Sequence, residues 1–223
     1  MKINNTLFIL DTETGGVDPN KYSLMEVAGI VLKNWKVVYK YTTLVKSPKG
    51  IYNCNEFARS LHGIEDEQIE NEGKLPIEII TDFKKIRDTY FDGEPMTIVA
   101  HNASFDISFI KHMFAENGQE LNSLPDNNEY AYDKIFSRNT IDTATMALIL
   151  RLQNKLSFDR CSLDNILKFY GIEDKQLKRH SALSDAKQTV KAFLCLFKSL
   201  SGKKVFNNSK NIYDIDFDDS KKI

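Results

Sequence analysis

Residues 7–16 read Leu7-Phe8-Ile9-Leu10-Asp11-Thr12-Glu13-Thr14-Gly15-Gly16. The four apolar residues predict a buried strand, and the polar residues after them predict a turn at its carboxyl end. If the chain stays extended, Asp11 and Glu13 leave the same face of the strand, because side chains alternate with a period of two. Crowded carboxylates repel, so a positive charge must offset them. Ligands often bind at the carboxyl ends of strands in α/β sheets, although a pair of exposed acids is the alternative.

Working outward, the rest of the chain predicts an α/β fold. Two β-rich runs joined by Lys33-Asn34 indicate a hairpin, whereas apolar residues at three- and four-residue spacing indicate helices. We expect strands at residues 24–32, 36–45, 96–100 and near 140–141, and helices at 76–91, 103–116, from 143, from 162 and at 183–200. Hairpin strands followed by alternating strands and helices predict a mixed five-stranded sheet flanked by helices.

We expect one domain over residues 1–202, followed by a polar, acidic tail at residues 203–223. Residues 119–139 combine Pro, Asp and Asn with aromatic residues but show no period, which predicts an inserted loop. The insertion and the tail are either docking segments or flexible linkers.

Composition excludes several classes of protein. Hydrophobic residues are 42% and charged residues 27% of the chain, which is typical of a globular protein. No apolar run reaches the roughly 20 residues of a membrane span, and the start lacks a signal-peptide core, so we expect a cytoplasmic protein without membrane contact. Three scattered cysteines indicate neither a disulfide framework nor a zinc site. A net charge of −1 argues against a broad basic surface for duplex nucleic acid, but bound metal ions would let a nuclease do without one.

Two further segments carry candidate site residues. Asp106 falls in the first turn of the helix after the strand at residues 96–100, so it should lie at the same sheet edge as Asp11; its alternative role is to complement the helix dipole. His180 comes just ahead of the last helix and Asp185 lies inside it. Five residues of helix rise roughly 7.5 Å, so these two could serve adjacent positions of one site. An exposed histidine after Lys178-Arg179 is the alternative.

These residue types suit phosphodiester hydrolysis. Carboxylate oxygens select hard cations such as Mg²⁺ or Mn²⁺, and two ions can stabilise the attacking and the leaving oxygen of an in-line displacement. A histidine can accept a proton from the attacking water near neutral pH. Phe105 offers a face for a nucleobase, although an aromatic residue beside a helix start can equally belong to the core.

Three motifs in this order resemble those of the DEDDh exonuclease family, which includes the proofreading subunits of bacterial DNA polymerase III. They are Asp11-Thr12-Glu13-Thr14-Gly15-Gly16, His101-Asn102-Ala103-Ser104-Phe105-Asp106 and His180-Ser181-Ala182-Leu183-Ser184-Asp185-Ala186. Residues 61–64, 141–143 and 163–172 resemble lesser blocks of the family. The sequence departs from the pattern at Gly15, where the family has a second threonine, and this bears on the nucleotide pocket.

The resemblance implies a ribonuclease H-like fold and a 3′→5′ exonuclease that uses two divalent cations, Mg²⁺ or Mn²⁺. It implies that His180 is the general base and that the metal ligands are Asp11, Glu13, Asp106 and Asp185. The terminal nucleotide would contact Thr12, Thr14, Leu61, His62, Asn102 and Phe105.

The implied substrate is a single-stranded or frayed 3′ end, DNA in preference to RNA, with a DNA polymerase as a possible partner in proofreading or repair. An RNA 3′-exonuclease or oligoribonuclease would use the same site, since the choice depends on the 2′-hydroxyl. An inactive nucleic-acid-binding module is the alternative outside enzymes, and metal-dependent turnover of a labelled 3′ end would separate the two.

Overall fold

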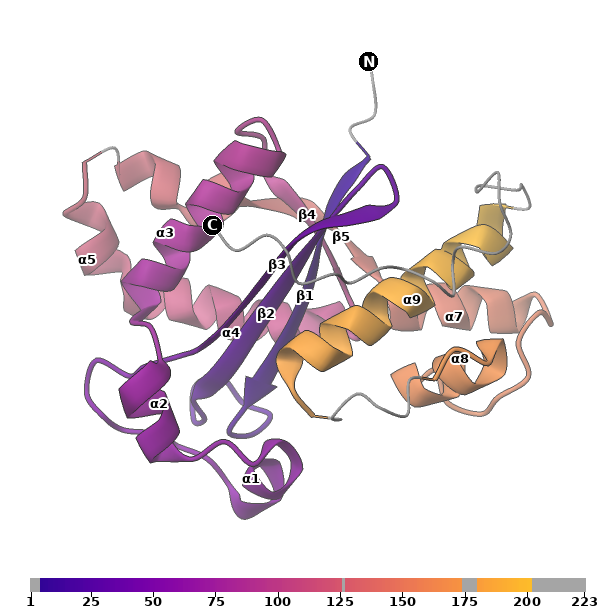
Figure 1. The fold of residues 1–223 in the computed structure, drawn as a ribbon, viewed down its shortest axis with the longest axis horizontal. Helices are drawn as coiled ribbons and strands as arrows, with labels where there is room; N and C mark the ends of the chain where they lie inside the picture. Colours follow the sequence, from indigo (N-terminus) through magenta and orange to yellow (C-terminus); the bar gives the residue numbers. More distant parts are fainter. Residues whose placement is uncertain (1–4, 126, 174–179, 202–223) are drawn as a thin grey trace.

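The computed structural model describes residues 5–125, 127–173 and 180–201 (Figure 1). Its centre is a five-stranded sheet in the order β3-β2-β1-β4-β5. β1 runs antiparallel to β2, β2 antiparallel to β3, and β1, β4 and β5 run parallel. The strands are Thr6–Thr14, Leu24–Lys33, Lys36–Leu44, Met96–Ala100 and Phe136–Asp142 for β1 to β5. The predicted mixed sheet is therefore confirmed, with β5 longer than expected.

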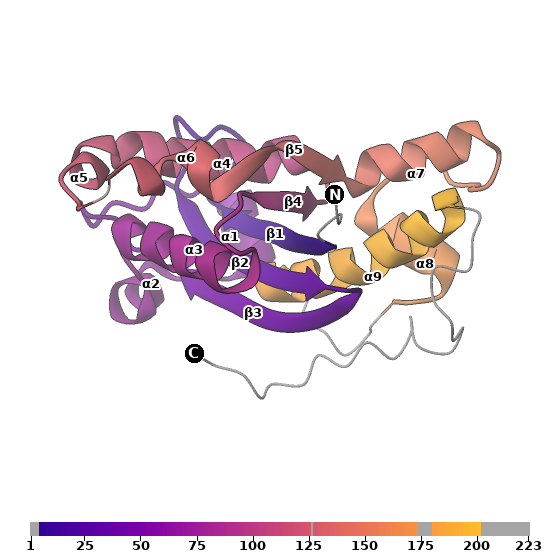
Figure 2. The same cartoon turned by 90° about the horizontal axis from the view of Figure 1, so that it is seen from above.

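Helices cover both faces of the sheet (Figures 1 and 2). One face packs against α3 (Pro76–Tyr90) and α4 (Ala103–Glu116), and the other against α7 (Thr143–Leu152), α8 (Leu163–Tyr170) and α9 (Ala182–Ser201). Phe8 points into the first core and Ile9 into the second. A strand buried on both faces has to be apolar throughout, which explains the run at residues 7–10.

β1 does not end where the sequence predicted. Its pairing with β2 continues to Thr14, which faces Leu24 after an irregularity between Glu13 and Thr14. The expected polar turn therefore begins later, and Asp11 and Glu13 are strand residues. The parallel pairing of β1 with β4 brings the carboxyl ends of both strands to the same edge of the sheet.

Two short helices, α1 (Glu56–His62) and α2 (Asp66–Glu72), lie beside this edge and were not predicted. Asn55 caps α1 by accepting a hydrogen bond from the Ala58 amide, and Gly63, at φ 67°, ends it. Each helix has only seven residues, which is too short for a clear amphipathic period.

The prediction that residues 119–139 form a loop is wrong. They contain most of α5 (Gly118–Asn122), the 3₁₀ helix η1 (Asn127–Tyr130), α6 (Tyr132–Ile135) and the start of β5. Arg87 of α3 holds the segment, because its buried guanidinium pairs with Glu129 at 2.9 Å and donates to the Lys134 carbonyl at 3.1 Å. Tyr132 packs against Phe114 and Phe136. The predicted tail at residues 203–223 lies outside the described residues. Within the described chain, no helix is both long and apolar enough to span a membrane.

Candidate active site

Three carboxylates meet at the carboxyl end of β1. Asp11 and Glu13 lie two residues apart on β1, and Asp185 lies in the first turn of α9, which packs against β1 and β2. Each offers one oxygen atom, and these atoms lie within 4.8 Å of one another. Side chains on β1 alternate between the two faces of the sheet, so Asp11 and Glu13 lie on the same face as Ile9, which α9 covers.

Asp106 approaches the group from the other face of the sheet. Thr12 points to that face, and its hydroxyl donates to Oδ1 of Asp106 at 2.8 Å. Asp106 is only 4% exposed. It stands outside the tight group of three but close enough for its charge to raise the pKa of Asp11. The structure thus gathers the four predicted carboxylates, three in one cluster and the fourth held beside it by Thr12.

The electrostatics of Asp11 fit a cation site. Burial raises the pKa of Asp11 well above its usual value, and the charges of Asp106, Asp185, Glu13 and Glu26 raise it further. A bound cation would reverse this repulsion, and a set of carboxylate oxygens matches the preference of Mg²⁺ and Mn²⁺. The site therefore fits the expected metal ions in donor type and in charge.

The buried acid also predicts how stability depends on pH. Burial raises the pKa of Asp106 to about 7, although hydrogen bonds from the Thr12 hydroxyl and from backbone amides lower it. Its pKa in the unfolded chain is about 3.9. The folded state holds this proton more tightly, so its contribution to stability is complete below about pH 4 and is lost as the pH rises through 7.

Metal-free protein should therefore lose stability between pH 5 and pH 8, and the loss should be smaller in Asp106→Asn. Asparagine keeps an oxygen acceptor for the Thr12 hydroxyl but carries no charge. Thermal unfolding at both pH values in EDTA, and again with Mn²⁺, measures this. An equal loss in both proteins would show that Asp106 is not the group responsible.

His180 lies two residues before α9, as predicted. It is half-buried, and its φ of 60° places it in the left-handed region, which is uncommon for residues other than glycine. Asp185 is hydrogen-bonded to the residue after His180, because the Asp185 backbone amide donates to the Ser181 carbonyl at 3.0 Å. The general base and one metal ligand predicted from the sequence therefore belong to one turn of chain.

The threonines predicted to contact a nucleotide have partners within the protein. The hydroxyl of Thr12 binds Asp106, and the hydroxyl of Thr14 donates to the Gly16 carbonyl at 2.7 Å. Thr12 and Thr14 are both buried. In this structure both hydroxyls therefore bond to other groups of the protein beside the carboxylates.

Asn102 and Phe105 stand at the start of α4. Asn102 is exposed and has a φ of 62°. Its backbone amide donates a hydrogen bond to the Asp142 carboxylate at 2.9 Å. Phe105 is half-buried, and its ring lies 5.3 Å from that of Phe109. Part of the Phe105 side chain is therefore accessible beside Asp106, as stacking on a base requires.

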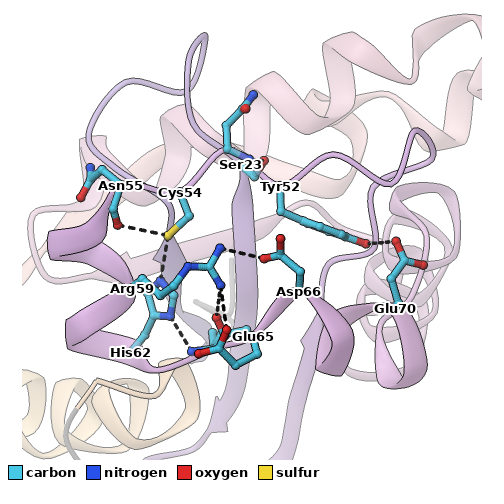
Figure 3. Close-up of polar contacts among 11 residues, drawn as sticks. Ser23, Tyr52, Cys54, Asn55, Arg59, His62, Glu65, Asp66 and Glu70 are labelled. Carbon is cyan, nitrogen blue, oxygen red and sulfur yellow. Dashed lines mark hydrogen bonds and ion pairs between the residues drawn. The ribbon is translucent and has the colours of Figure 1, made fainter.

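Leu61 and His62 of α1 differ in accessibility. Leu61 is 41% exposed, whereas His62 is 3% exposed. Nδ1 of His62 accepts a hydrogen bond from the Ile64 amide at 2.9 Å, and Nε2 faces the Cys54 sulfur at 3.6 Å (Figure 3). Burial lowers the pKa of His62, and the charge of Arg59 lowers it further. A neutral ring with its proton on Nε2 fits both contacts, so His62 here packs α1 in place.

Comparison with known proteins identifies the family. A family model described as Exonuclease (RNase_T) matches residues 8–193. The chain belongs to the exonuclease (RNase_T) family. It is 30% identical to DNA polymerase III subunit epsilon of Rickettsia prowazekii, covering 84% of this chain and 72% of that protein. The resemblance to the DEDDh exonuclease family, with its proofreading subunits of DNA polymerase III, is thereby confirmed, and the protein is a nuclease.

Other relatives of this exonuclease are much longer. DNA polymerase III PolC-type of Thermotoga petrophila is 28% identical over 86% of this chain, but the chain spans only 12% of it. Exonuclease I of Methylocaldum szegediense superposes with a TM-score of 0.67 at 19% identity, covering 90% of this chain and 42% of that one. The structural likeness confirms the predicted ribonuclease H-like fold.

Gly15 departs from the exonuclease family pattern for a reason that the structure explains. Its amide donates to the Ser23 carbonyl and its carbonyl accepts from the Asn55 amide, both at 2.8 Å. A side chain at this position would collide with the Asn53 backbone. The segment before α1 therefore occupies the space that the threonine of the family would need.

We expect Gly15→Thr to destabilise this exonuclease by about 1–3 kcal/mol, since overpacking forces backbone shifts. Gly118→Thr is a matched control, because a side chain there would meet open space. Denaturant unfolding of the two variants and the wild type gives the comparison. Equal stability of all three proteins would show that residues 53–55 adjust freely.

Two site residues were missed by the sequence reasoning. Asp142 joins the starts of α4 and α7, because its carboxylate accepts from the amides of Asn102 and Ala144. Glu26 faces Glu13 across the β1–β2 pairing. One signal for Glu26 was available, since it is the single charged residue in the apolar run at residues 24–32.

Proposed function

We propose that this exonuclease removes nucleoside monophosphates from the 3′ ends of DNA with the help of two divalent cations, Mg²⁺ or Mn²⁺. One observation carries the proposal: Asp11, Glu13 and Asp185 converge within 4.8 Å, with buried Asp106 beside them. We assign these four side chains as metal ligands and His180 as the general base.

The chain's residues would divide the chemistry as follows. When bound, the cations supply positive charge that stabilises the attacking and leaving oxygens of the scissile phosphate. His180 accepts a proton from the attacking water as its oxygen bonds to phosphorus. The bond from phosphorus to the 3′ oxygen of the preceding nucleotide then breaks, and this leaving oxygen takes up a proton from solvent water. The products are a nucleoside 5′-monophosphate and a strand with a new 3′-hydroxyl.

The named relatives support DNA as the substrate. Subunit epsilon is part of a DNA polymerase by its name, and exonuclease I of E. coli, with a TM-score of 0.67, has been solved with single-stranded DNA. We propose a single-stranded or frayed 3′ end as the substrate and a polymerase as a partner. Parallel digestion of single-stranded DNA, mismatched duplex DNA and RNA with labelled 5′ ends tests this. Faster digestion of RNA would favour the RNA exonuclease instead.

A 3′-phosphate on the strand should block digestion. The pocket that we propose for Leu61 and Phe105 would close around one terminal nucleotide and leave no place for an added charged group. Digestion of matched oligonucleotides with a 3′-hydroxyl or a 3′-phosphate measures the effect. Efficient cutting of a circular single strand would contradict an exonuclease that needs a free end.

A further inference from the structure

Glu26 connects the sheet to the turn that carries His180. Its Oε2 accepts a hydrogen bond from the Ala182 amide at 3.0 Å, across 156 residues of sequence. Its Oε1 accepts from the Thr42 hydroxyl on β3, also at 3.0 Å. Both oxygens of Glu26 therefore have donors within the protein, one on β3 and one at the start of α9.

The Ala182 amide that Glu26 binds is at the start of α9. Ala182 is the first residue of α9 and is fully buried, and the first amides of a helix have no partner within the helix. A carboxylate at this end also complements the helix dipole. Glu26 thus caps α9 from a neighbouring strand, a role that a side chain just before a helix usually performs.

The capped residue lies between two candidate site residues in the sequence. His180 lies two residues before Ala182 and Asp185 three residues after it, within the first turn of α9. His180 holds an uncommon backbone conformation, which persists only where the surroundings determine it. Glu26 lies on β2 directly opposite Glu13 of β1. The side chain that caps α9 is therefore also a neighbour of a proposed metal ligand on β1.

We infer that Glu26 is a positioning residue of the exonuclease reaction, which holds the turn of residues 180–185 at the carboxylate cluster. The inference rests on the proposed function for His180 and Asp185. Glu26→Ala removes the acceptor and should lower kcat by about 10- to 100-fold, the usual effect of losing an outer partner of a site. Glu26→Gln should restore most of the rate, because its amide can accept from Ala182 and donate to Thr42.

A matched control separates positioning from stability. Glu78 makes the same kind of contact at α3, where its carboxylate accepts from the Leu75 amide at 2.9 Å. Glu78→Ala should lower the melting temperature about as much as Glu26→Ala but leave kcat unchanged. In a His180→Ala background, Glu26→Ala should cost clearly less than it does in the wild type, since residues that act through each other are not additive. Equal losses in both backgrounds would overturn the inference.

Hydrogen exchange of the metal-free protein tests, without any turnover, whether Glu26 holds the turn of residues 180–185 in place. Amides at residues 181–186 should exchange faster in Glu26→Ala than in the wild type and Glu26→Gln, whereas Glu78→Ala should leave them unchanged. Unchanged exchange and a normal rate in Glu26→Ala would overturn the inference while the proposed function stands. An inactive wild type with faster exchange in Glu26→Ala would overturn the proposed function but support the contact by which Glu26 holds this turn.

Discussion

Asp11→Asn should lower the rate of strand digestion by about 10³-fold or more at saturating Mg²⁺. In the proposed mechanism the substitution removes one charged ligand from a site whose cations would stabilise the transition state by several kcal/mol, and each 1.36 kcal/mol is tenfold in rate. The same change should raise the melting temperature of the metal-free protein, because burial and neighbouring carboxylates disfavour the charge on Asp11. Activity and stability should therefore move in opposite directions.

The measurement pairs single-turnover digestion with thermal unfolding in EDTA. Asp92→Asn is the matched control, because it makes the same chemical change at an exposed residue before β4, at the other end of that strand from the site. Asp106→Asn should behave like Asp11→Asn. Near-normal activity of either site variant with saturating Mg²⁺ would remove the two-metal assignment.

His180→Ala should lower kcat by about 10²- to 10⁴-fold, the usual contribution of a positioned general base. The metal concentration for half-maximal rate should change far less, because the carboxylates remain. In the wild type the single-turnover rate should rise with pH, because a base must be deprotonated to accept a proton from the attacking water. This rise belongs to the coupled system of metal, water and base, and it should flatten or move in His180→Ala.

A pH series at saturating Mg²⁺ for both proteins gives the comparison. His112→Ala controls for loss of an imidazole, since His112 lies on α4 and pairs with Glu116 at 3.4 Å. An unchanged pH profile in His180→Ala would exclude it as the base. A loss that added metal restores would indicate a role in metal binding instead.

The sequence was most informative where one element carried the signal. The apolar run at residues 7–10 predicted a central strand, and the two-residue spacing of Asp11 and Glu13 predicted that both face one side. The period of α4 and α9 placed Asp106 and Asp185 near the starts of helices. These features depend on local periodicity and on the parallel order of strands, so they could be predicted without the structure.

Folding decided how those residues are held. Thr12 was predicted to contact the substrate, yet in the structure its side chain lies on the α4 face and binds Asp106, 94 residues away. The contact between Glu26 and Ala182 and the one between Arg87 and Glu129 likewise join distant parts of the chain. Such contacts leave no period in the sequence. The sequence by itself therefore indicated which carboxylates the candidate site gathers and that Asp11 and Glu13 share one face of β1. Only the tertiary structure decided which neighbours hold these side chains, because those bonds form between elements that meet only after folding.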